Sequence, residues 1–369
     1  MSFTEIVGRV WEVLTRRIDS FLLGCALALF GVGLATLFSA ADQSVARMST
    51  QLMSFAFALV LMWILANIPP QTLARAALPL YVVGVLLLVG VALFGVVVNG
   101  SRRWLNVGIA RIQPSELMKI ALPLMLAWYF QKFEGRINWK DFAVAAVLIV
   151  LPVYLIKRQP DLGTALLIGA SGFYVLFLAG LSWKIIAGMA AVGGAAGPYF
   201  WSQLHGYQRE RILTFIDPSR DPLGAGYHST QASIAIGSGG VIGKGWLNGT
   251  QTHLDFLPER HTDFIFAVFG EEFGLIGAAL LLALYMLLIG RALVITANAS
   301  TLFARLLAGA VTLMFFTYAF VNMGMVSGLL PVVGVPLPLM SYGGTALVSI
   351  FIGLGVLMSV QAHRTLVKT

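Results

Sequence analysis

The sequence predicts an all-α, polytopic integral membrane protein that folds as one transmembrane domain over residues 1–369. Hydrophobic residues make up 58% of the chain and charged residues only 11%, whereas a soluble domain carries roughly 25% charge. The mean hydropathy is +0.86, and a soluble core cannot conceal so much apolar surface, because it still needs a polar exterior. The apolar residues also gather in runs long enough to cross a bilayer.

Ten runs of mostly apolar residues approach the ~20 residues that a spanning helix needs. An even number of spans places both termini on the same side. With the N-terminus in the cytoplasm, twelve Lys and Arg residues fall on the cytoplasmic side and six in the short loops opposite, as the positive-inside rule expects. The predicted spans are 18–39, 51–68, 77–98, 116–131, 141–157, 163–181, 184–202, 264–291, 302–326 and 342–362.

A long segment, residues 203–262, separates the seventh and eighth predicted helices and is not apolar enough to span. We predict that it forms a large extracytoplasmic loop. The segment is rich in Gly, Ser, Thr, Pro and Asp, and it contains Tyr207, Tyr227 and Trp246. Loops longer than ~15 residues are usually functional or disordered, and the aromatic residues and isolated charges favour a functional loop.

Three kinds of site find no support in the sequence. The net charge of +8 forms no basic stripe with interleaved aromatic residues, so no nucleic-acid partner is predicted. The run Gly237–Gly245 fails as a phosphate-binding loop, because Ser238 stands where that motif needs Gly and Gly245 where it needs Ser or Thr; we interpret it as a tight turn. No metal site is predicted, because the spacing of the nearest candidate ligands matches no strong signature. These candidates are His253, Asp255 and His261.

An acidic residue lies where the long segment meets the eighth predicted helix. Asp263 follows a polar run and precedes the apolar run that begins at Phe264. We place it in the first helical turn, at the outer membrane surface, with Thr262 as a candidate N-cap. One interpretation is structural, because helix N-termini favour acidic residues. The other is a general base, although a helix N-terminus lowers the pKa of a carboxylate and weakens such a base unless burial opposes the effect.

Two ionisable residues lie inside the fourth predicted helix. Glu116 and Lys119 are three residues apart and therefore share a helix face. Charges inside a membrane are candidates for function, because their burial in hydrocarbon is costly. The pair either joins helices as a mutually neutralising unit or orients a substrate or a base, and the sequence favours the two interpretations equally.

Basic residues gather near the predicted outer ends of several helices. They either bind lipid head groups or form a pocket for a pyrophosphate, because the guanidinium fork of arginine matches phosphate oxygens. These residues are Arg102, Arg103, Arg111, Lys157, Arg158, Arg209, Arg211 and Arg260.

Four segments carry a wider resemblance: Asn99–Lys119, Arg158–Thr164 with Arg-Gln-Pro-Asp-Leu-Gly-Thr, Arg209–Asp263 ending in Pro-Glu-Arg-His-Thr-Asp, and Asn322–Gly344. In this order they resemble the SEDS family, bacterial proteins of shape, elongation, division and sporulation. The resemblance covers the whole chain, including the number of predicted helices. The residues of the last two segments resemble the rod-shape branch of the family more than the division branch.

The resemblance implies a peptidoglycan glycosyltransferase that polymerises lipid II during cell elongation, with inversion and release of undecaprenyl pyrophosphate. It implies two kinds of protein partner, a class B penicillin-binding protein and other membrane proteins of the rod complex. It also implies a bacterial inner-membrane location, with cytoplasmic termini and an active site that faces the periplasm. Carried over by motif, Asp263 is the catalytic carboxylate, and Trp104, Glu116, Lys119 and Asp161 are functional positions.

This chemistry needs a base on the acceptor hydroxyl and positive charge on the departing pyrophosphate. We hypothesise that Asp263 is the base and that the positive charge comes from arginines, namely Arg102, Arg103, Arg158, Arg209 or Arg211. A divalent cation, Mg²⁺ or Mn²⁺, is an open alternative, because either can neutralise phosphates. Two other functions compete: a lipid II flippase and a non-catalytic scaffold for the penicillin-binding protein. A flippase needs a site reached from both sides, whereas the unusual polar residues cluster on one predicted side.

Overall fold

The computed structural model describes residues 15–98, 101–106, 111–159, 161–204, 206–217, 225–253 and 259–364. Nine of the ten predicted spans each overlap a single helix, the tenth (184–202) begins with α8, and the all-α membrane fold class is confirmed. These helices are α2 (Ser20–Ala40), α3 (Val45–Asn67), α4 (Pro70–Phe94), α5 (Pro114–Lys132), α6 (Trp139–Lys157), α7 (Leu162–Leu178), α8 (Trp183–Ala195), α13 (Ile265–Ala297), α14 (Leu302–Val326) and α15 (Gly344–Ala362).

Length and composition make seven of these helices able to cross a membrane, among the residues that the structure describes. The other three are α5, which carries Glu116, Lys119 and Lys132, and the shorter α7 and α8. A span count of ten therefore stays a prediction. The run expected at 184–202 is divided, because Pro198 begins a separate short helix, α9 (Gly197–Gln203), and proline cannot continue the hydrogen-bond ladder of a preceding helix.

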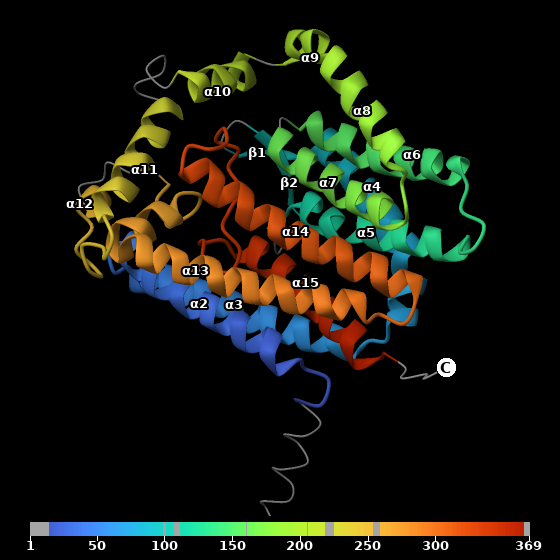
Figure 1. The fold of residues 1–369 in the computed structure, drawn as a ribbon, viewed down its shortest axis with the longest axis horizontal. Coiled ribbons are helices and arrows are strands. Elements are labelled where there is room, and N and C mark those ends of the chain that lie inside the picture. The colour runs from blue at the N-terminus through green and yellow to red at the C-terminus, as the bar shows by residue number, and fades with distance from the viewer. Residues whose placement is uncertain are drawn as a thin grey trace, which may run out of the picture.

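The helices bury apolar side chains in two main clusters. One cluster joins α2, α3, α13 and α15, and the other joins α4, α5, α6 and α7, while α14 contributes to both. Figure 1 shows α14 between these two groups of helices. Large apolar side chains such as Phe57, Leu86 and Val147 remain exposed on α3, α4 and α6, as expected where lipid rather than water covers a helix bundle.

Two ion pairs mark the opposite ends of the bundle. Asp19, the N-cap of α2, accepts hydrogen bonds from Arg291 near the end of α13, with the guanidinium Nε 3.1 Å from Oδ2. At the other end, Asp42 follows α2 and pairs with Arg260, which precedes α13. We call this second end the cleft end, because the cleft described below opens there.

The long segment 203–262 is more regular than the predicted loop. It contains α10 (Gly206–Ile216), α11 (Ala225–Gly239) and α12 (Thr250–His253), and Figure 1 shows α8 to α12 as an arc along the top and left of the molecule. α11 packs on α13. The indole Nε1 of Trp246 donates to the carbonyl of Ala35, 2.9 Å away on α2, so the segment is docked on the membrane helices.

The glycine run begins in the last turn of α11 and continues from Gly240 as the predicted tight turn, which packs against a kink in α13. Gly274 interrupts the helix with φ +65° and ψ −163°. The amide of Lys244 donates to the Glu271 carbonyl, and the amide of Leu275 donates to the Gly240 carbonyl. Gly243 makes this contact possible, because a Cβ there would lie 2.1 Å from the Glu272 carbonyl oxygen.

A small antiparallel sheet connects α4 to α5 at the cleft end. It consists of β1 (Val96–Val98), β2 (Ser101–Asn106) and β3 (Arg111–Ile112), in that order. The three valines of β1 favour extended backbone, and Val96 pairs with Trp104 of β2. Since successive side chains of a strand point to opposite faces, Arg102 and Arg103 face different surroundings.

Candidate active site

A cleft of about 540 Å³ opens among α5, the start of α7, the end of α14, the start of α15 and the 331–336 segment. It brings together residues from five separate parts of the sequence: 103–119, 161–167, 212, 263 and 318–346. Five of the predicted functional residues line it: Arg103, Glu116, Lys119, Asp161 and Asp263. The rest of the wall is largely apolar and includes Tyr318 and the 331–336 segment. A mostly apolar cleft with a few convergent ionisable groups is the usual form of a binding site.

Asp263 occupies a turn just before α13 rather than the first helical turn that the sequence predicted, and the predicted N-cap is also wrong. The N-cap of α13 is Phe264, which makes no side-chain capping bond. The hydroxyl of Thr262 instead donates to the carbonyl and the carboxylate of Glu259, at 3.1 and 2.8 Å. Thr262 is therefore not the helix cap, because its hydroxyl is committed to the turn that precedes the helix.

The backbone of this turn is held by other segments of the cleft end. The Asn322 amide donates to the Asp263 carbonyl at 2.8 Å and to the Val335 carbonyl at 2.7 Å. The Ser341 hydroxyl donates to the Thr262 carbonyl at 2.6 Å, and the Tyr342 amide donates to the His261 carbonyl at 2.9 Å. These bonds fix the backbone from which the Asp263 side chain extends.

Gly334 leaves space beside the Asp263 carboxylate. Its φ is +76°, which favours glycine, and a Cβ at this position would lie 3.3 Å from Oδ2 of Asp263. The 331–336 segment can therefore pass close to the carboxylate without covering it. Gly163 plays a similar part at the start of α7, where a Cβ would meet the Val333 side chain at 2.8 Å.

Glu116 and Lys119 form the ion pair that their spacing predicts. Lys119 Nζ lies 2.6 Å from Glu116 Oε1, the Ser349 hydroxyl of α15 donates to Glu116 Oε2 at 2.7 Å, and the ammonium lies 5.0 Å from the ring centroid of Tyr318 on α14. The pair thus joins three helices and also lines the cleft. These contacts support the interpretation that the pair joins helices, and the role in orienting a substrate or a base stays a prediction.

Arg103 and Asp161 form a second ion pair in the cleft wall. Arg103 Nη1 lies 3.4 Å from Asp161 Oδ2, and Asp161 also caps α7 by accepting a hydrogen bond from the Thr164 amide at 3.1 Å. The Arg103 side chain is 35% exposed and that of Asp161 10%. The arginine therefore presents part of its charge to the cleft while its partner anchors the start of α7.

The other predicted residues have partners away from the cleft wall. Arg102 is exposed and donates to the Ala92 carbonyl at 3.4 Å. Arg158 lies over the ring of Tyr154, and Arg209 donates to the carbonyls of Trp201 and Ser202. Trp104 is half-buried in β2. The side chains of Arg111, Arg211 and His253, and the whole of Asp255, lie outside the described residues.

Candidate metal ligands do not cluster in the described ranges, the cleft included. No group of three or more His, Cys, Asp or Glu there could ligate a metal ion. The cleft offers carboxylates, and it also offers the cations Arg103 and Lys119.

Sequence reasoning gave no role to Asn322, Gly334, Ser341, Tyr318 or Ser349. The signals that could have indicated them are the polar Asn322 near the end of an apolar run and the Gly and Pro residues from Pro331 to Gly344. An amide in an apolar helix must find partners, and here its partners are the backbone of the Asp263 turn.

The fold and the cleft together define a multi-pass membrane protein with an ionisable, partly apolar cleft at one end of its helix bundle. The family model for cell cycle proteins of the FtsW, RodA and SpoVE type matches residues 19–366, and the chain belongs to this family. The predicted SEDS resemblance, including its likeness to the rod-shape branch, is confirmed.

Individual relatives are similar over nearly the whole chain. The peptidoglycan glycosyltransferase MrdB of Escherichia coli K12 is 50% identical over 352 residues, which cover 95% of each chain. A structure on the coordination of polymerization and crosslinking by a peptidoglycan synthase complex gives a TM-score of 0.82 at 33% identity, covering 95% of this chain and 99% of that one. The rod shape determining protein RodA of Thermus thermophilus gives 0.71 at 31% identity, covering 94% and 97%.

Proposed function

We propose that this chain is a peptidoglycan glycosyltransferase that polymerises lipid II into glycan strands during cell elongation. The observation that carries the proposal is the cleft in which the carboxylate of Asp263 lies with the cations Arg103 and Lys119. The family membership and the 50% identity to a peptidoglycan glycosyltransferase support it. The protein lies in the bacterial inner membrane, with both termini in the cytoplasm and the cleft end facing the periplasm.

The reaction joins an acceptor sugar hydroxyl to the anomeric carbon of the donor. Asp263 takes the hydroxyl proton as the acceptor oxygen forms its bond to the anomeric carbon from the face opposite the leaving group. The bond from that carbon to the pyrophosphate oxygen breaks, so configuration inverts and undecaprenyl pyrophosphate departs with its charge. A positioned base contributes typically 10²–10⁴-fold to such a transfer.

Positive charge near the leaving pyrophosphate comes first from Arg103, which has the exposure to reach it. Lys119 is the second source, although Glu116 already shares its charge. Arg102, Arg158 and Arg209 are weaker candidates, because their contacts lie away from the cleft. A divalent cation, Mg²⁺ or Mn²⁺, bound to pyrophosphate oxygens is the alternative source.

The lipid part of the substrate also suits this location. Much of the cleft wall is apolar, and a narrower apolar cavity continues beneath it between α5, α13, α14 and α15. The sugars and pyrophosphate of the substrate can therefore remain beside the ionisable residues of the cleft while its undecaprenyl chain stays among apolar side chains. The partner is a class B penicillin-binding protein, consistent with the similarity to a peptidoglycan synthase complex.

The test is polymerisation of purified lipid II by the full chain with its class B penicillin-binding protein, read as glycan length on a gel. We expect polymer from the wild type and none from a folded Asp263→Asn, with thermal unfolding as the check on folding; the bond from Asn322 goes to the backbone of residue 263 and is kept in the variant. Polymer from both would remove Asp263 as the base.

Two controls separate the competing functions. Lipid II that crosses liposome membranes without polymerising would support the flippase. If neither the wild type nor Asp263→Asn makes polymer but both recruit the penicillin-binding protein, the scaffold function would be supported. A chelator that abolishes polymerisation, with restoration by Mg²⁺ or Mn²⁺, would assign leaving-group charge to a divalent cation.

A further inference from the structure

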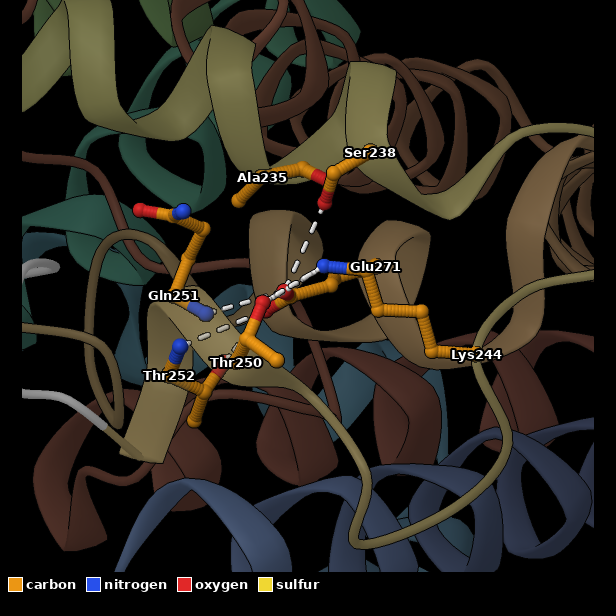
Figure 2. Close-up of polar contacts among 7 residues, drawn as sticks. All are labelled: Ala235, Ser238, Lys244, Thr250, Gln251, Thr252 and Glu271. Carbon is orange, nitrogen blue, oxygen red and sulfur yellow. Dashed lines mark hydrogen bonds and ion pairs between the residues drawn. The ribbon is translucent and has the colours of Figure 1, made fainter.

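Outside the cleft, another carboxylate is buried where α13 meets the long segment 203–262. Glu271 is 0% exposed and lies two turns into α13. Figure 2 shows donors from Ser238 through Thr252 converging on it. Oε1 receives the Lys244 ammonium at 2.7 Å, the Gln251 amide at 2.9 Å, the Thr250 hydroxyl at 3.2 Å and the Ser238 hydroxyl at 3.4 Å. Oε2 receives the Thr252 hydroxyl at 3.1 Å and amide at 3.3 Å.

This number of donors explains how a charge is tolerated there. An ionised carboxylate offers about four lone-pair sites, and a buried charge without partners is strongly destabilising. Lys244 supplies the opposite charge, and the backbone amides of α12 supply fixed donors. Glu271 therefore fastens the segment from Ser238 to Thr252 to α13, rather than joining only one neighbour.

The same contacts lead to the turn that carries Asp263. The carbonyl of Thr252 accepts a hydrogen bond from the guanidinium Nη1 of Arg260, and Arg260 is 8% exposed. Arg260 precedes Asp263 by three residues, and its Nη2 pairs with Asp42 at the end of α2. Thr252 thus connects the Glu271 carboxylate on one side with the Asp263 turn on the other.

The adjacent residue has similar burial but different partners. Glu272 is 1% exposed; its carboxylate accepts from the Ser39 hydroxyl of α2 and from the Leu247 amide, the latter at 3.2 Å. Glu272 thus contacts α2, whereas Glu271 holds Thr252. The two residues form a matched pair for testing, with the same side chain, the same helix and comparable burial.

We propose that Glu271 is a positioning residue that, through Thr252 and Arg260, holds the turn carrying Asp263 in its productive place. Asp263 is bound on one side by Asn322, Ser341 and Tyr342 through the backbone of its turn. Glu271 completes the support from the opposite side, that of the long segment. The catalytic consequence of this inference rests on the proposed function, but the attachment of Thr252 by Glu271 can be measured without any substrate.

The experiment compares the wild type, Glu271→Gln and Glu272→Gln in the full chain, in nanodiscs with the penicillin-binding protein. Hydrogen–deuterium exchange reports on the amides of Gln251 and Thr252, and lipid II kinetics report kcat and KM. We expect Glu271→Gln to speed exchange at these two amides and lower kcat by about 10–100-fold, with KM within about twofold, because misplacing a catalytic group slows chemistry. Glu272→Gln should leave exchange at Thr252 unchanged.

Lys244→Met provides a second variant in case Glu271→Gln fails to fold, since Lys244 is partly exposed. It should act in the same direction with a smaller effect. Unchanged exchange at Gln251 and Thr252 would overturn the proposal, as would faster exchange with wild-type kcat, or a rise in KM alone. A wild type that makes no polymer would reject the proposed function, and the exchange data would still decide whether Glu271 fastens Thr252.

Discussion

Glu116 and Lys119 meet 2.6 Å apart on one face of α5, in the wall of the cleft that holds Asp263. Their side chains are only 16% and 9% exposed, so neither charge is well solvated. A buried ion pair contributes little net stability compared with apolar side chains, yet the loss of one partner is costly. This asymmetry allows the structural and the functional interpretations of the pair to be separated.

We predict that Glu116→Gln and Lys119→Met each destabilise the protein by about 3–5 kcal/mol, because each leaves an uncompensated charge. The double variant should recover most of this stability. Thermal unfolding in detergent measures the stability, and lipid II polymerisation measures the activity. If the double variant recovers both stability and polymerisation activity, the pair is a structural link between helices. If it recovers stability but not activity, Lys119 contacts the substrate.

Gly334 should be required beside Asp263 for two separable reasons. Gly334→Ala adds a Cβ 3.3 Å from Asp263 Oδ2 and forces alanine into φ +76°, which costs about 1–2 kcal/mol. We expect polymerisation to fall by at least about tenfold, because a small misplacement of a catalytic group is costly.

The control for this change is Gly135→Ala. Gly135 has φ +78° and no atom within 4 Å of an added Cβ, so it carries the same backbone penalty without the contact. Equal losses of stability, with loss of activity only in Gly334→Ala, would assign the effect to the cleft. Equal activities would show that the Asp263 carboxylate tolerates the methyl group.

Two neighbouring arginines should differ sharply in importance. Arg103→Gln removes the cation that lines the cleft and pairs with Asp161, and polymerisation should fall by about 10²-fold, because electrostatic groups at a developing charge contribute on that scale. Arg102→Gln should stay within about twofold of the wild type. Initial rates of lipid II consumption are the measurement, and similar losses in both variants would contradict the assignment.

Stability should depend on pH through His261, which follows Arg260 in the turn. Burial lowers the pKa of His261; Arg47 and Arg260 also lower it, whereas Glu259 and Asp42 oppose the effect. The folded state therefore favours neutral imidazole, while the unfolded chain binds a proton near pH 6.5. The contribution of neutral His261 is complete above pH 6.5 and is lost as the pH falls below it.

Thermal unfolding of the wild type and of His261→Gln between pH 8 and 5 measures this effect. The wild-type Tm should fall more steeply below pH 6.5 than the Tm of the variant. Parallel curves would show that another group controls the acid response.

Much of the membrane architecture could be predicted from the sequence, because each apolar run must satisfy its backbone hydrogen bonds within the bilayer and so forms a helix locally. The Glu116–Lys119 pair was predictable for the same reason, since its geometry depends on one helix. The N-cap assignment of Thr262 failed, because its hydroxyl has a competing acceptor in Glu259, and local pattern does not rank the two.

Only the tertiary structure decided which ionisable residues share the cleft. Arg102 and Arg103 are equivalent in the sequence, and the alternation of β2 together with the position of Asp161, in the cap of a distant helix, separates them. Glu271 was visible only as an acid within an apolar helix, and its donors come from 19 to 33 residues away in the chain. Such contacts depend on where a kinked helix and a docked turn meet, which no local period of the sequence encodes.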